Sequence, residues 1–227
     1  MSSVPRPGAG MTLVASACIV LLIGCGSATG ETPALVDGSG QVRSETRSVG
    51  AFDKVEIRHG IDLRLVVGSP RRVSVTAQEN LLAMTTTTVS DGRLVVEAER
   101  DFFSCDGITV SVTTPTITEL VLHDAATGRV DGLDAAMLAV HVDHGATLTM
   151  TGSADWLGLS SHGGCAIDLG DFMARDATVE LAEGVVVRIG VSDTIAGSAT
   201  GGVALTISGH PRTVDVRTSG GSTVSIR

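Results

Sequence analysis

Residue types that could do chemistry gather in the second half of the chain, next to short runs of small residues. The densest example is LSSHGGCAIDL, residues 159–169, and related stretches lie upstream. Imidazole and carboxylate groups bind zinc and other divalent ions, so one interpretation is a metal site. Its candidate ligands are His123, Asp124, Asp143, His144 and His162. The other interpretation is a set of solvated polar turns, and the scaffold must decide between the two.

Catalysis has weaker support in the sequence. Ser160, Ser161, His162 and Asp168 lie close together, but no nucleophile-elbow or Ser-x-x-Lys pattern accompanies them. Asp131 and Asp134 could form a glycosidase pair, although the connecting segments are short for an active site. We therefore expect no enzyme and no cofactor. The alternative is a metal-dependent or carbohydrate-active β-helix enzyme that uses the His/Asp corners.

The N-terminus predicts export and a lipid anchor. Residues 1–24 carry one charge, Arg6, and an apolar run over 11–23, as in a secretory signal peptide. The run ends in Leu22-Ile23-Gly24-Cys25, which resembles the bacterial lipobox. Cys25 is then the lipidated residue, and more than one acyl chain would attach the protein stably to the outer face of the cell membrane.

Two further cysteines, Cys105 and Cys165, would remain in an exported and oxidising compartment. They predict a disulfide, and the alternative is a pair of buried thiols.

Composition limits the possible partners. The formal net charge is −9 and aromatic residues make up 2% of the chain. An acidic surface repels phosphate backbones, and few rings are available for base stacking, so nucleic acid is excluded as a partner.

The rest of the chain divides into a linker and one domain. Residues 25–48 hold the lipidated cysteine and a small, polar segment that predicts a flexible tether. Residues 49–227 are the size of a single domain. Within it apolar residues alternate with a period of two, as in Ile61, Leu63 and Leu65, which predicts an all-β fold. The one helix candidate is a short turn over 79–84.

A longer period in the second half predicts stacking of these strands. Small residues recur after pairs of apolar residues at intervals of 17 to 21 residues, namely at Ala125, Gly145, Gly163, Gly184, Gly201 and Gly220. Strands joined by tight glycine corners at this spacing are typical of a β-solenoid. We therefore predict a single-domain, right-handed parallel β-helix-like solenoid. The insertion over 97–107, with Phe102 and Phe103, would cap its apolar column, and the alternative is an exposed contact patch.

The mature chain resembles the putative auto-transporter adhesin, head GIN domain family. The resemblance rests on VGAFDKVEI at 49–57 with GIDL at 60–63, on VSVTA at 73–77 with NLL at 80–82, on DGRL at 91–94, and on the glycine-cornered repeats. It implies a β-helix-like fold and a cell-envelope location, and it brings no catalytic residues. The histidines depart from the usual Ser-Gly corners. Together these points predict a lipid-anchored envelope protein for adhesion, scaffolding or binding, whose partners are the membrane and an envelope polymer or protein.

Overall fold

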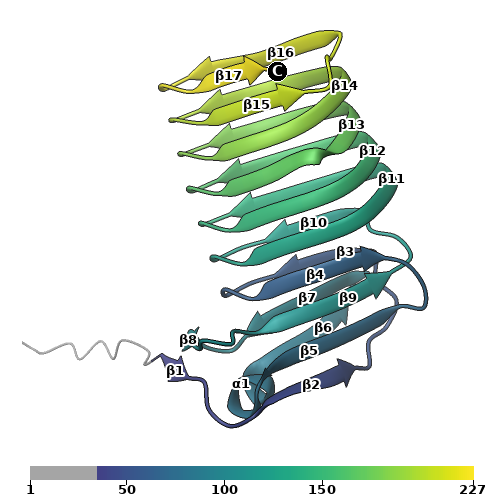
Figure 1. Cartoon of the computed structure of the whole chain (residues 1–227), viewed down its shortest axis with the longest axis vertical. Helices are drawn as coiled ribbons and strands as arrows, with labels where there is room; N and C mark the ends of the chain where they lie inside the picture. The colour runs from purple at the N-terminus through teal and green to yellow at the C-terminus, as the bar shows by residue number, and fades with distance from the viewer. Residues whose placement is uncertain (1–34) are drawn as a thin grey trace, which may run out of the picture. The chain divides into compact units, whose positions relative to one another are not determined.

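The computed structural model describes residues 35–227, and Cys25 and the signal segment lie outside them. Four long strands form the centre of the molecule and lie parallel to one another (Figure 1). They are β11 (Thr127–Asp143), β12 (Thr147–His162), β13 (Ala166–Ala182) and β14 (Val186–Thr200). Each strand bends at a register shift near its middle, so its two halves lie on opposite sides of a flattened coil.

Shorter strands extend both sides of the coil. On the first side, β11 to β14 are followed by β15 (Ala204–Ser208) and β17 (Thr223–Ile226), and preceded by β4 (Asp62–Val67) and β9 (Thr109–Thr114). On the second side they are followed by β16 (Thr213–Ser219). They are preceded there by β10 (Glu119–Leu122), β3 (Lys54–Ile57) and β7 (Arg93–Ala98). All of these pairings are parallel, as a solenoid requires.

The N-terminal end is closed by antiparallel strands and a helix. β5 (Arg72–Gln78) pairs with β9, β2 (Val42–Arg47) pairs with β5, and β6 (Thr85–Ser90) pairs with β7. Helix α1 (Glu79–Met84) joins β5 to β6 and buries Leu81 and Leu82 against the end of the core. A two-residue pairing of β1 (Val36–Asp37) with β8 (Phe102–Phe103) lies beside this end.

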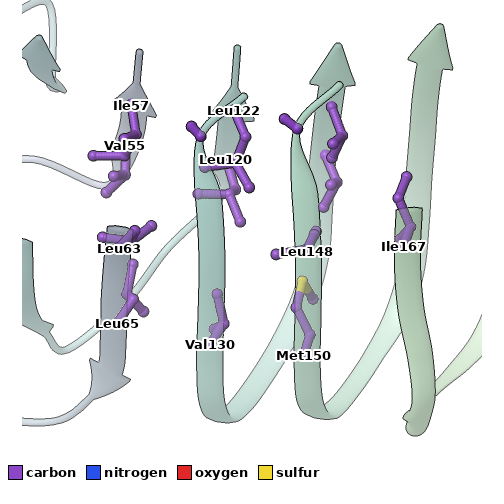
Figure 2. Close-up of a cluster of buried hydrophobic side chains, with 14 of the residues drawn as sticks. Val55, Ile57, Leu63, Leu65, Leu120, Leu122, Val130, Leu148, Met150 and Ile167 are labelled. Atoms are coloured by element: carbon purple, nitrogen blue, oxygen red, sulfur yellow. The ribbon is translucent and has the colours of Figure 1, made fainter. Parts of the chain in front are cut away.

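The core is a column of aliphatic side chains from both sides of the coil. Figure 2 shows part of it, with Val55, Leu63, Leu120, Leu148 and Ile167 drawn from β3, β4, β10, β12 and β13. Parallel strands lie about 4.8 Å apart, so inward side chains of neighbouring turns are in contact and leave no room for water. One turn alone could not bury its apolar face, and stacking is what makes the fold stable. The predicted all-β parallel solenoid is confirmed, and so is the short helix over 79–84.

Two predictions about the ends of the domain were wrong. The tether was predicted to run to residue 48, but β2 pairs along its whole length with β5, from Val42 opposite Gln78 to Arg47 opposite Val73. The folded part therefore begins before residue 49. The insertion over 97–107 does not cap the column, because α1 does so. Within the insertion, Phe102 packs against the core beside the N-terminal end, and Phe103 is exposed.

The corner residues of successive turns form a ladder that is more regular than the predicted spacing of 17 to 21 residues. Backbone hydrogen bonds place Ala125 beside Gly145, then Gly164, Gly184, Gly202 and Gly221. Three of these glycines lie one residue later than predicted, at the second of two adjacent glycines. Positive φ angles are found here, as at Gly164 (75°) and Gly184 (75°), so a side chain would be strained at these corners.

Among residues 35–227, no helix is long and apolar enough to cross a membrane.

Candidate functional site

The five predicted metal ligands do lie together, on the corner between the second and first sides. Asp143 and His162 are the last residues of β11 and β12 and face each other in register. His123 precedes them in the same row, because its N–H bonds the Ile57 carbonyl one turn earlier. Asp124 and His144 occupy the next row, and both adopt a positive φ of 54°. The solenoid therefore converts residues about 20 positions apart into neighbours.

Within this histidine corner, imidazoles and carboxylates alternate. Asp143 lies between two rings: its Oδ1 is 2.8 Å from His162 Nδ1 and its Oδ2 is 3.5 Å from His123 Nδ1. The backbone N–H of His162 also donates to Asp143 Oδ1 at 3.2 Å. In the second row, His144 Nδ1 is 3.7 Å from Asp124 Oδ1. The His144 and His162 rings meet edge to face, with centroids 5.2 Å apart.

This arrangement satisfies the polar groups of the corner but does not form the predicted metal site. Both oxygens of the Asp143 carboxylate are already turned to imidazole nitrogens. Across the described part of the chain, no three His, Cys, Asp or Glu side chains converge where one ion could bind them. A metal site needs its ligand atoms to point at a common centre, whereas here they point at one another.

The serine and cysteine side chains near residue 162 also form hydrogen bonds within the scaffold rather than a reactive site. Ser161 is buried, and its hydroxyl donates to the Val142 carbonyl at 2.5 Å. Cys165 is buried as well, and its thiol donates to the carbonyls of Val142 and His162, both at 3.2 Å. Asp168 lies on a different strand, where it pairs with Arg188 at 3.6 Å. These groups do not assemble a triad.

The predicted disulfide is wrong, because Cys105 and Cys165 are both free. Cys105 is exposed on the insertion before β9, and Cys165 is buried just before β13. β4, β11 and β12 lie between those two strands. At about 4.8 Å per strand the separation is roughly 19 Å. A disulfide needs Cα atoms within about 7 Å.

A broad flat surface covers the outside of the first side of the coil. We call it the hydroxyl face, and it comprises the outward residues of β9, β4, β11, β12, β13, β14, β15 and β17. Two of its rows are rich in threonine and serine. Thr127 and Thr147 are joined by a hydroxyl hydrogen bond of 3.2 Å, and so are Thr206 and Ser225. Each such pair places two hydroxyl groups at the strand spacing, and between the pairs β13 and β14 present Ala166, Asp168, Val186 and Arg188 instead.

Charged residues and shallow grooves lie among these hydroxyls. Arg64 and Arg129 are in register on β4 and β11, and both side chains are exposed. Each lies near a carboxylate two residues away on its own strand, Arg129 at 2.9 Å from Asp131. A groove of about 520 Å³ runs over this region, and one of about 230 Å³ lies between β12, β13 and β14. The hydroxyl face is thus an open surface of mixed character, which also exposes Val66 and Val186, rather than an enclosed active site.

Sequence analysis missed a charge network on the second side. Glu56 is almost fully buried for a charged residue, at 8% exposure, and pairs with Arg58 and with Arg93, the latter at 3.3 Å. Arg93 also donates to Glu119 at 2.7 Å, and this hydrogen bond raises the pKa of the Arg93 guanidinium above its usual value. The three strands involved are far apart in sequence, so only their register reveals the network.

A cavity of about 840 Å³ was also unforeseen. It opens between the end of β2 and the start of β5, and Arg47, Arg71 and Arg72 are among its lining residues. Arg71 lies over the Phe52 ring, 5.1 Å from its centroid, and its NH2 group donates to the Phe52 carbonyl. These contacts hold Arg71 against the domain.

The family model for the putative auto-transporter adhesin, head GIN domain, matches residues 51–211. The chain belongs to the head GIN domain family. The match runs from just before β3 to the turn after β15, so it includes α1 and most of the coil but not β1, β2, β16 or β17. Among curated proteins, none is significantly similar in sequence to this chain.

Solved structures support the fold of this head GIN domain. A putative adhesin from Bacteroides fragilis superimposes with a TM-score of 0.66 at 14% identity, covering 85% of this chain and 100% of its own. A putative adhesin from Parabacteroides distasonis gives 0.54 at 14% identity, with 86% and 100% covered. One from Parabacteroides merdae gives 0.51 at 16% identity, with 85% and 98% covered. At these identities the likeness concerns the fold alone.

Proposed function

We propose that the protein is a lipid-anchored component of the cell envelope that binds an extended polar polymer through its hydroxyl face, without catalysis. Membership of an adhesin-like family supports export and a binding role. The observation that carries the proposal is the hydroxyl face itself, a continuous array of parallel strands with outward hydroxyl and guanidinium groups. Enzymes use concave sites that exclude water, and this surface is flat.

The spacing between polar groups on the hydroxyl face would match the spacing between polar groups along the polymer. Polar groups on neighbouring strands lie about 4.8 Å apart, as Arg64 and Arg129 or Thr127 and Thr147 do, and a polymer with a short polar repeat could contact several strands at once. Each contact would be weak, because exposed hydrogen bonds and ion pairs contribute about 1 kcal/mol or less. Several together would give useful avidity.

The lipid anchor is tested at Cys25. Cells expressing the full chain are fed an alkyne fatty acid, and the purified protein is coupled to a fluorophore. We expect label on the wild type and none on Cys25→Ala. Cys165→Ala controls for labelling of other thiols and should retain the signal. Equal label on Cys25→Ala and the wild type would remove the anchor from the proposal.

The hydroxyl face is tested with insoluble peptidoglycan sacculi as the polymer. The fraction of protein that sediments with sacculi is measured for the wild type, for Arg129→Glu and for the control Arg175→Glu. Arg129 lies on the hydroxyl face, whereas Arg175 lies at the bend of β13, and their side chains are similarly exposed, 60% and 58%. We expect the sedimenting fraction to fall several-fold for Arg129→Glu and to stay unchanged for Arg175→Glu. Because salt screens charge interactions, the sedimenting fraction of the wild type should rise at low salt. Equal retention of all three proteins, or equal loss in both variants, would contradict this assignment.

A further inference from the structure

Within residues 35–227, the C-terminal end of the solenoid is open, unlike the N-terminal end. β16 and β17 are the outermost strands, and within residues 35–227 neither has a neighbour on its outer side (Figure 1). Their outward edges therefore present unpaired backbone N–H and C=O groups. An edge of this kind is a ready template for another strand.

The apolar column also reaches this end uncovered. Val214 and Ile226 occupy the inward positions that Ile195 and Ile207 occupy one turn earlier. The isoleucines are fully buried, but Val214 is 37% exposed and Ile226 is 56% exposed. The last turn therefore lacks the apolar burial that stabilises all preceding turns. A partner that covers these side chains would be favoured.

The opposite end shows how the same chain protects an edge. There α1 covers the column with Leu81 and Leu82. The outer strand β2 carries charges that are already paired, with Arg43 2.7 Å from Glu79 and Arg47 3.3 Å from Glu45. Paired charges and a helical cap discourage further strand pairing. The C-terminal end has neither device in the described structure.

We propose that this open end pairs with the same end of a second copy of the chain, across a twofold axis. β16 would lie antiparallel to β16 of the partner, centred on Val216. In that register Asp215 lies opposite Arg217 of the other copy, and Arg217 lies opposite its Asp215. Both side chains are exposed, and neither forms an ion pair within residues 35–227. Val214 falls opposite Thr218, so the inward rows of the two copies join into one column.

The symmetry of β16 supports a second copy rather than an unrelated strand. The strand runs from Thr213 to Ser219, and Val216 is its central residue, so twofold pairing aligns it over its whole length. Opposite charges directly across an antiparallel pair are favourable, and like charges are unfavourable. Such an isologous contact is closed, and the capped N-terminal ends prevent further growth, so the expected product is a dimer and not a fibre.

This pairing places the capped ends of the two copies at opposite extremes. If both copies are anchored near their N-termini as proposed above, the contact would join copies held on two facing surfaces. That consequence rests on the proposed function, whereas the end-to-end pairing does not.

The test is a charge reversal read by sedimentation velocity. The full chain is purified in one detergent, so any association through micelles is common to all samples. We expect the wild type to be dimeric, Asp215→Arg and Arg217→Asp each to be largely monomeric, and the double variant Asp215→Arg/Arg217→Asp to recover the dimer. Arg175→Asp makes the same charge change away from the open end and should stay dimeric.

A monomeric wild type, or single variants as dimeric as the wild type, would overturn the end-to-end pairing. A double variant that stays monomeric would overturn the register centred on Val216. Fatty-acid labelling at Cys25 is measured on the same samples, and its failure would leave the dimer unaffected. The failure of the anchor and the failure of the pairing are therefore distinguishable.

Discussion

Gly197 offers a sharp test of the stacking on the second side of the coil. It lies in the second half of β14, directly opposite Val179 of β13, with a φ of 139°. A Cβ placed there would lie 1.9 Å from the Val179 carbonyl oxygen and 2.8 Å from its carbonyl carbon. Those atoms belong to the backbone of the neighbouring turn, so they cannot move aside without separating the two strands.

The expected cost of Gly197→Ala follows from these contacts. A side chain in this region of backbone space costs about 1–3 kcal/mol. Forcing extra atoms into a packed interior costs about 1–3 kcal/mol more. We expect Gly197→Ala to lower the free energy of unfolding by about 4 kcal/mol. Gly184→Ala is the matched control, because Gly184 also has a positive φ, 75°, but a Cβ there would meet no atom within 4 Å. Strain alone predicts about 1 kcal/mol for it.

The assay is urea unfolding followed by the fluorescence of Trp156, the one tryptophan of the chain. The difference of about 3 kcal/mol between the two variants corresponds to about 6–12 °C in Tm, since about 1 kcal/mol shifts a domain of this size by 2–4 °C. Equal losses of stability in Gly197→Ala and Gly184→Ala would refute the close approach of β13 and β14 on the second side of the coil, and with it the register of Val179 and Gly197.

Three further outcomes are expected. Alkylation of the native protein should modify the exposed Cys105, whereas Cys165 should react only after unfolding, and mass spectrometry of both forms distinguishes this from a disulfide. Leu81→Ala should cost about 2–4 kcal/mol in urea unfolding, because it opens a cavity in the cap at a side chain with 0% exposure. Arg93→Ala should cost about 1–3 kcal/mol, because it removes one of the two arginines that neutralise the nearly buried Glu56, and Arg93→Lys should recover part of that loss.

The coil was predictable from sequence because the same alternation of apolar and polar residues recurs in each turn. Inward residues such as Leu63, Val110 and Leu148 alternate with polar ones, and each turn repeats the pattern after nearly the same number of residues. A parallel stack needs no other information, since each turn pairs only with its neighbours. The short helix at 79–84 was also correctly placed.

The capped end was not predictable in the same way. β2 is polar throughout except for Val42, so its composition resembles a linker, and only pairing with β5 makes it a strand. The insertion at 97–107 has the aromatic residues expected of a cap, yet α1 supplies the fully packed cap residues Leu81 and Leu82, whereas Phe102 is only partly buried against the core. Neither feature repeats, and a single pairing between distant segments leaves no periodic trace in a sequence.

The chemistry of the histidine corner was decided by a shift of one residue. The predicted equivalence of Gly145 and Gly163 would place the preceding residues, His144 and His162, side by side, where two imidazoles on adjacent turns could share an ion. The structure instead places His162 beside Asp143, because the corner after β12 uses both Gly163 and Gly164. Asp143 then receives an imidazole from each neighbouring turn, and its carboxylate is satisfied without a metal. In a parallel stack, side chains in the same row of adjacent turns are in contact. The number of glycines at a corner sets this register, and so determines which side chains meet, although the glycines themselves make none of these contacts.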